Sequence, residues 1–159
     1  MAAKTTSTRE KIEQFLGQKR LAIVGVSRDR ADISRQLMTE FRNRGYDAVP
    51  VTPTVTEMDG LTCYARVQDI VPPVKAVLIM TPPKVTEQIV RDCAAAGVSQ
   101  VWLYRGLSAG AVSAEATAFC EEHGISVVAG FCPFMFFPEN GWFHQAHGFF
   151  KKLAHTYPN

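Results

Sequence analysis

The chain has 159 residues, of which 47% are hydrophobic and 20% are charged, a balance that is typical of globular proteins and excludes a disordered chain. Its formal net charge of only +2 gives no sign of the basic stripe that binds nucleic acid. No apolar run approaches the roughly 20 residues that span a membrane. We therefore expect one domain over residues 1–159, with no nucleic-acid or membrane partner.

The four cysteines, Cys63, Cys93, Cys120 and Cys132, form no Cys-x-x-Cys pair. A disulfide framework is typical of much shorter secreted chains. The amino-terminal residues also lack the apolar segment of a signal peptide. Both observations predict reduced thiols and a cytoplasmic protein.

The first predicted element is a helix within residues 1–18. Ser7 and Glu10 have the spacing of a capping box, apolar residues follow at helical spacing, and Gly17 is a natural end. Residues 21–26 then form an uninterrupted apolar run. Such a run is typical of a strand that is buried on both faces, as in a parallel sheet.

An amphipathic helix follows, with apolar residues from Ile33 to Phe41, and ends at Gly45. Either Asp29 or Asp32 can cap its amino terminus, because both are good capping residues that precede the apolar face.

Strands and helical stretches alternate through the rest of the chain. The predicted strands cover residues 21–26, 46–51, 74–80, 98–103 and 125–129, with a loop around Gly60 and Tyr64 between the second and the third. This alternation favours right-handed strand–helix–strand crossovers. It predicts a Rossmann-like α/β fold, with three α/β/α layers around a mostly parallel five-stranded sheet.

Residues 131–159 form an aromatic-rich extension, because seven of the ten phenylalanines follow residue 130. Apolar residues are spread around much of a predicted last helix, from about Gly141 to His155. Two interpretations stay open. The helix is part of the core, or it also forms the interface of a homodimer.

The segment between the first strand and the next helix predicts a phosphate site. A helix amino terminus offers backbone N–H groups and the positive end of the helix dipole to an anion. Gly25 allows a sharp turn, Ser27 offers a hydroxyl donor, and Arg28 offers a guanidinium. Arg30 and Arg35 lie nearby, either as solvated charges or as ligand contacts. The segment departs from the Gly-x-Gly-x-x-Gly pattern, because Ser27 stands at the second glycine position.

The ends of the second and third strands predict the rest of the site. NAD-binding domains usually carry Asp or Glu at the end of the second strand, where it binds the ribose hydroxyls. Here Val51, Thr52 and Pro53 stand at that end, and Thr-Pro-Pro ends the third strand at residues 81–83. These side chains suit the face of an adenine ring better than they suit the hydroxyls of a ribose. Parallel sheets bind ligands at the edge where these strands end.

These features occur in an order that resembles a known family. The matching segments are residues 22–28, 45–46, 49–53, 60–61, Tyr64, 81–83, 97–98, 101–103 and 130–136. Over about residues 20 to 150, the chain resembles the small stand-alone CoA-binding proteins related to the N-terminal domain of the succinyl-CoA synthetase alpha subunit.

The resemblance implies coenzyme A (CoA), or an acyl-CoA, as the ligand. The residues that it implies on the pyrophosphate side are Gly25, Val26, Ser27 and Arg28. The residues that it implies on the adenosine side are Val51, Thr52, Pro53, Thr81, Pro82 and Pro83. Family members often have Asn in place of Thr52, which lacks the donor and acceptor pair of an amide.

No arrangement of residues predicts a catalytic centre. His144 and His147 have i,i+3 spacing, and with Cys132 they could hold a metal, but packing or an interface explains them as well. No cysteine stands in the setting of a nucleophile with a named base. We therefore predict no catalytic or metal-binding residue. Arg105, after the fourth strand, faces either the ligand or solvent.

Three functions stay open. A binding protein for CoA or an acyl-CoA is favoured over an enzyme. The second is an NAD(P)-dependent enzyme, but no carboxylate follows Val51, and no arginine lies between Val49 and Thr56 to bind the phosphate of NADP. The third is an interaction protein with a vestigial nucleotide site, whose working surface is the aromatic-rich extension.

Overall fold

The computed structural model describes residues 5–106 and 110–137 of the chain. Within them, five parallel strands form the main sheet in the order β2-β1-β5-β6-β7. The strands are β1 (Arg20–Val24), β2 (Asp47–Val51), β5 (Ala76–Ile79), β6 (Gln100–Leu103) and β7 (Ser126–Ala129). The predicted α/β fold with a five-stranded parallel sheet is confirmed, and each strand overlaps its predicted segment.

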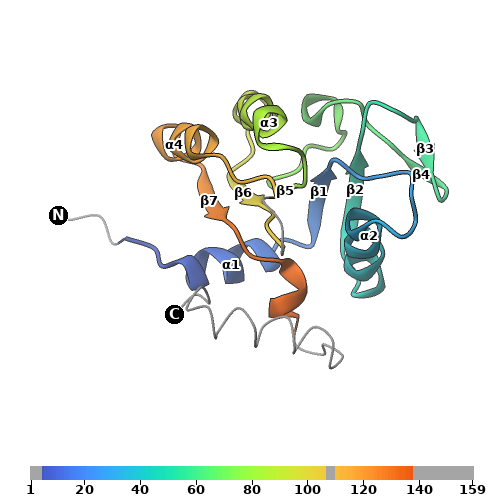
Figure 1. The fold of residues 1–159 in the computed structure, drawn as a ribbon, viewed down its shortest axis with the longest axis horizontal. Coiled ribbons are helices and arrows are strands. Elements are labelled where there is room, and N and C mark those ends of the chain that lie inside the picture. Colours follow the sequence, from blue (N-terminus) through green and yellow to red (C-terminus); the bar gives the residue numbers. More distant parts are fainter. Residues whose placement is uncertain (1–4, 107–109, 138–159) are drawn as a thin grey trace.

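Helices cover both faces of this sheet (Figure 1). They are α1 (Thr8–Leu16), α2 (Ile33–Asn43), α3 (Pro83–Ala95) and α4 (Ala114–Glu122). Successive side chains of a strand point to opposite faces. Ile23 of β1 therefore packs in the core with α1 and α2, whereas Ala22 packs in the core with α3 and α4. Because both faces are covered, the strands are apolar without alternation.

The first two helices begin at predicted caps. The Ser7 Oγ accepts the Glu10 N–H at 3.2 Å, and the Ser7 N–H donates to the Glu10 carboxylate at 2.8 Å, so the capping box of α1 is confirmed. Asp32, rather than Asp29, caps α2, because its Oδ1 accepts the Ser34 N–H at 2.8 Å.

The segment between β2 and β5 contains a hairpin where the sequence predicts a loop. Its strands are β3 (Glu57–Met58) and β4 (Leu61–Thr62), and the short helix η1 (Val67–Asp69) follows. Asp59 and Gly60 form the turn with φ angles of 51° and 78°, as a two-residue hairpin turn requires. The Asp-Gly dipeptide is a strong signal for such a turn. The strands themselves are too short to show an alternating pattern.

The open side of the edge strand β2 is covered by the chain itself. Tyr64 returns to it, and the Tyr64 N–H donates to the Pro50 carbonyl at 3.1 Å. Pro50 has no N–H to offer, and the Arg42 Nη1 donates to the Ala48 carbonyl at 3.2 Å. This cover blocks the pairing of β2 with a strand of another chain.

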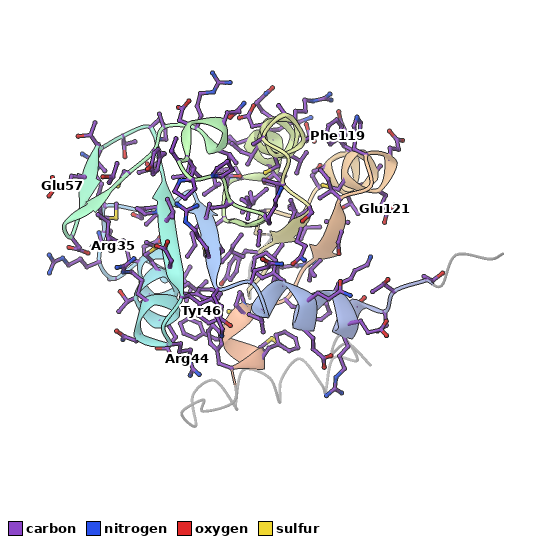
Figure 2. The ribbon with its side chains drawn as sticks, turned by 180° about the vertical axis from the view of Figure 1, so that it is seen from behind. Arg35, Arg44, Tyr46, Glu57, Phe119 and Glu121 are labelled. Atoms are coloured by element: carbon purple, nitrogen blue, oxygen red, sulfur yellow. The ribbon has the colours of Figure 1, made fainter. Side chains whose placement is uncertain are left out.

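The aromatic-rich extension begins as part of the core. The short helix η2 (Pro133–Phe136) follows β7. Phe137 packs edge-on against Phe41 of α2, with 5.1 Å between the ring centroids. The Arg44 guanidinium lies 4.4 Å from the centre of the Phe137 ring, at the end of α2 where Figure 2 labels Arg44 and Tyr46. The first aromatic residues of the extension therefore hold α2 against the rest of the fold.

The predicted last helix over residues 141–155 lies outside the described residues, as do His144 and His147. A homodimer interface, one of the two interpretations of this helix, stays a prediction. Among the described helices, none has the length and apolar character needed to cross a bilayer.

Candidate functional site

Three loops meet at the carboxyl edge of the sheet. β2 and β5 flank β1 and run parallel to it, so all three strands end at one edge. The chain leaves β1 toward α2 on one face and leaves β5 toward α3 on the other, which makes this point a topological switch (Figure 1). The structure thus brings residues 25–28, 51–53 and 81–83 together at this edge.

Gly25 is the point at which the loops touch. Its N–H donates to the Val51 carbonyl at 3.0 Å. Its φ of 91° lies in the left-handed region, and a Cβ there would lie 3.0 Å from the Met80 carbonyl oxygen and 3.1 Å from the Thr81 Cγ2. Only glycine combines this backbone conformation with such a close approach. Gly25 therefore holds its loop against both neighbouring strands.

The loop after Gly25 is folded by its own side chains. The Ser27 N–H donates to the Ser34 Oγ at 2.9 Å, and the Asp29 N–H donates to the Ser27 Oγ at 3.0 Å. The Asp29 carboxylate accepts the Ala31 N–H at 2.9 Å. The Ser27 hydroxyl accepts one bond in this way and keeps its proton for a further acceptor.

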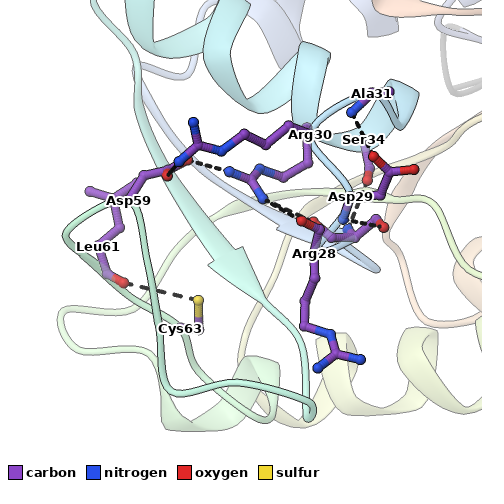
Figure 3. A network of polar contacts seen from close by, with 10 residues as sticks. Arg28, Asp29, Arg30, Ala31, Ser34, Asp59, Leu61 and Cys63 are labelled. Atoms are coloured by element: carbon purple, nitrogen blue, oxygen red, sulfur yellow. Dashed lines mark hydrogen bonds and ion pairs between the residues drawn. The ribbon is translucent and has the colours of Figure 1, made fainter.

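Several donors at this edge have no acceptor within the described residues. They include the N–H groups of Val26 and Arg28 and the Arg28 guanidinium. Figure 3 shows the exposed Arg28 side chain extending away from the ion pair between Arg30 and Asp59. The Arg28 guanidinium can therefore reach an anion in front of the loop.

Arg105, after β6, is also exposed, so its contact with ligand or with solvent stays open.

The amino terminus of α2 is already occupied by a carboxylate. The Asp32 Oδ1 accepts the Ser34 N–H at 2.8 Å and the Ser34 hydroxyl at 2.5 Å. The first turn of α2 consequently offers fewer free N–H groups than the strand–turn–helix pattern predicts. The loop before the helix keeps free donors for an anion, which include the N–H groups of Val26 and Arg28.

The residues at the end of β2 differ in exposure. Val51 and Thr52 are only 2% and 5% exposed, whereas Pro53 is exposed. The Thr52 Oγ1 lies 3.0 Å from the Thr54 Oγ1. Val51 thus shapes the edge through its carbonyl bond to Gly25, and Pro53 supplies the accessible apolar surface.

The end of β5 leads directly into α3. The Thr81 Oγ1 lies 2.9 Å from the Oγ1 of the buried Thr86, and the Thr86 N–H donates to the Pro82 carbonyl at 3.0 Å. Pro82 is the cap of α3, and Pro83 is its first residue, a position that tolerates the missing N–H. Pro82 is exposed, so the β5 side of the edge presents an apolar surface.

Arg35 of α2 contacts the loop from behind, and it is neither a solvated charge nor an exposed contact. Its side chain is only 8% exposed. Its Nη1 donates to the Arg28 carbonyl at 3.1 Å and to the Ser27 carbonyl at 3.4 Å. Its Nη2 pairs with Asp59 in the hairpin turn, on the side of α2 where Figure 2 labels Arg35. Asp59 was not among the predicted site residues, because no local pattern pairs it with a residue 24 positions away.

The described cysteines are buried thiols. Burial raises the pKa of Cys120 to about 11, and burial also raises the pKa values of Cys63 and Cys93. Burial and the neighbouring Cys132 raise the pKa of the Tyr104 hydroxyl. These groups stay protonated at neutral pH. Within residues 5–106 and 110–137, no three His, Cys, Asp or Glu side chains gather to hold a metal ion.

A separate hollow of about 220 Å³ lies between α2 and the β3–β4 hairpin. The residues that line it include Arg35, Met38, Arg42, Asp59 and Leu61. None of residues 25–28, 51–53 or 81–83 lines it. The hollow is therefore distinct from the carboxyl edge, and it is an alternative place for a small ligand.

The segments that build the carboxyl edge are shared with known proteins. A family model described as "CoA binding domain" matches residues 19–138, which include all three loops. The chain belongs to the CoA binding domain family. The match runs from the start of β1 to the end of η2, so this CoA binding domain includes the whole described sheet.

Relatives of this CoA binding domain include a small protein and part of a large enzyme. The uncharacterized protein YneT of Bacillus subtilis (strain 168) is 26% identical over 115 residues, which are 72% of this chain and 82% of that protein. An ADP-forming acetate–CoA ligase I of Archaeoglobus fulgidus is 24% identical over 127 residues, which are 76% of this chain and only 18% of the ligase. The ligase activity therefore belongs to a much longer protein.

A solved structure has the same architecture. The hypothetical protein from Pyrococcus horikoshii OT3 matches with a TM-score of 0.72 and 30% sequence identity, over 78% of this chain and 85% of that chain. This likeness extends over most of both chains, so it supports the fold of the whole CoA binding domain.

Proposed function

We propose that this protein binds CoA or an acyl-CoA at the carboxyl edge of β1, β2 and β5. The observation that carries the proposal is the family match over residues 19–138, because it includes every loop that meets at Gly25. The place agrees with a general rule, since open parallel sheets bind ligands where the strand order reverses.

The pyrophosphate contacts the loop from Gly25 to Arg28 in this proposal. Gly25 lets the phosphates approach the backbone closely. The N–H groups of Val26 and Arg28 and the Ser27 hydroxyl are available donors. The exposed Arg28 guanidinium adds charge-assisted hydrogen bonds, which are the strong ones for phosphate.

The adenosine contacts the ends of β2 and β5. Pro53 and Pro82 are exposed apolar side chains at these ends, with Thr81 and Pro83 beside Pro82. No carboxylate lies between Val51 and Thr56 to bind the ribose hydroxyls of NAD. The edge therefore suits the adenosine part of CoA better than that of NAD.

A thermal shift assay tests the ligand class. A ligand that binds only the native state raises the melting temperature by mass action. We expect CoA and acetyl-CoA to raise it, and NAD, NADP and FAD to leave it unchanged. A rise with NAD or NADP and none with CoA would overturn the proposal.

The double variant Ser27→Ala/Arg28→Ala tests the phosphate contact. It removes a hydroxyl donor and a charged donor, so we expect CoA affinity to fall about tenfold or more in a calorimetric titration. Arg9→Ala/Ser99→Ala is a matched control, because it removes the same side chains from exposed positions in α1 and just before β6. Equal affinity of both double variants for CoA would contradict the assigned phosphate contact.

A further inference from the structure

A buried arginine fixes the loop that is proposed to bind phosphate. Arg35 places one guanidinium against two carbonyl oxygens of the loop, those of Ser27 and Arg28, and against the carboxylate of Asp59. We propose that Arg35 is a positioning residue that orients the Arg28 N–H toward a bound phosphate. This inference rests on the proposed function, because it concerns the same loop.

The geometry of the peptide bond carries the first step. In a planar trans peptide, the C=O and the N–H point in opposite directions. The bond from Arg35 to the Ser27 carbonyl therefore turns the Arg28 N–H away from Arg35. The bond to the Arg28 carbonyl likewise turns the Asp29 N–H away, and that N–H donates to the Ser27 Oγ at 3.0 Å. Both peptide units around Arg28 are thus held, and its N–H makes no hydrogen bond within the described residues.

The charge of Arg35 is balanced before any ligand binds. A buried charge is costly unless it is paired and hydrogen-bonded, and Asp59 supplies the pairing. Asp59 also pairs with Arg30 at 3.2 Å, as Figure 3 shows. Because Arg35 is already bonded to Asp59 and to two carbonyl oxygens, its role is to hold the loop, while the exposed Arg28 can contact an anion.

The β3–β4 hairpin helps to hold the loop after β1, because its turn supplies Asp59. Its turn brings Asp59 to α2, and the guanidinium then connects the hairpin to the loop after β1. A planar guanidinium can serve two carbonyls and a carboxylate together, whereas a lysine ammonium is a single point charge on a flexible chain. Arg35→Lys should therefore keep the charge but hold the Arg28 N–H less firmly in its orientation.

The test compares ligands with and without phosphate. We expect Arg35→Leu to weaken the binding of CoA and ADP about tenfold, a loss typical of a hydrogen bond to a charged group, and to leave the binding of adenosine unchanged. Arg35→Lys should show a smaller loss of the same selectivity. Arg42→Leu is the matched control, because Arg42 lies two turns along α2 and donates to the Ala48 carbonyl of β2 instead. It should bind all three ligands like the wild type.

A second readout observes the donor itself. In two-dimensional NMR spectra, inorganic pyrophosphate should shift the Arg28 amide of the wild-type protein strongly and that of Arg35→Lys weakly. This measurement needs neither CoA nor the Leu variant, so it also serves if Arg35→Leu fails to fold.

The possible outcomes distinguish the two proposals. Unchanged ADP binding by Arg35→Leu, or equal losses for ADP and adenosine, would overturn the positioning role while CoA binding stands. The wild-type protein could instead fail to bind CoA and still show the Arg35-dependent shift of the Arg28 amide with pyrophosphate. That result would overturn the proposed function and keep the positioning role. A protein that binds neither CoA, ADP nor pyrophosphate would overturn both.

Discussion

Gly25 is the residue on which the geometry of the carboxyl edge depends. Its positive φ and its contact with Met80 and Thr81 are two separate constraints, and a side chain would violate both. A Cβ at a left-handed position costs about 1–2 kcal/mol through backbone strain alone. Overpacking against a rigid backbone adds to this cost.

Gly25→Ala should therefore be more destabilising than an alanine at a comparable glycine. Gly45 has a φ of 88°, and a Cβ added to it would meet no atom within 4 Å, so Gly45→Ala measures the backbone strain alone. We expect Gly25→Ala to lower the free energy of unfolding by about 1 kcal/mol more than Gly45→Ala. Urea denaturation measures both, and equal losses would show that the contact with Met80 and Thr81 does not contribute to stability.

The raised pKa of Cys120 predicts that the protein loses stability at alkaline pH. Its pKa is raised from 9.0 to about 11 in the folded protein, because it is fully buried. Below 9.0 both states hold the proton, and above it the unfolded chain releases the proton first, so stability falls up to about pH 11. The free energy of unfolding of Cys120→Ala should decline less steeply between pH 9.0 and about 11 than that of the wild type, as measured by urea denaturation. Identical slopes for the two proteins would contradict the raised pKa.

At the scale of the element, α2 connects the fold to the proposed site. Its apolar face packs in one core, its cap is Asp32, and its buried Arg35 holds the preceding loop. The apolar periodicity predicts the helix and its packing face. It does not predict Arg35 as a buried residue, because a charged side chain is expected at the surface unless a partner is known. The partner comes from a hairpin that no periodic pattern shows.

The cap of α2 can be tested against a neighbouring aspartate. Asp32→Ala removes the acceptor of the Ser34 N–H, and a lost cap costs about 1 kcal/mol of stability. Asp29→Ala removes the same charge from an exposed residue that caps no helix, so we expect a smaller loss. Thermal unfolding of the two variants compares them. Equal stability would show that α2 does not depend on its cap.

At the scale of the whole molecule, the sheet was predictable because its strands are buried on both faces. Uninterrupted apolar runs and the alternation with helices indicate the five strands and their parallel direction. The position of the loops at one edge then follows from the topology. The burial of Val51 and Thr52, the carboxylate at the start of α2, and the network around Arg35 depend on contacts between distant residues. No local sequence pattern carries such contacts.

The central claim is that CoA binds at the carboxyl edge of β1, β2 and β5, and an NMR titration of isotope-labelled protein with CoA tests it most directly. The account predicts that the largest amide shifts fall on residues 25–28 and on Thr81, which lie together at this edge. Shifts centred instead on Met38, Arg42 and Leu61, in the hollow between α2 and the hairpin, would contradict it. So would a spectrum that CoA leaves unchanged.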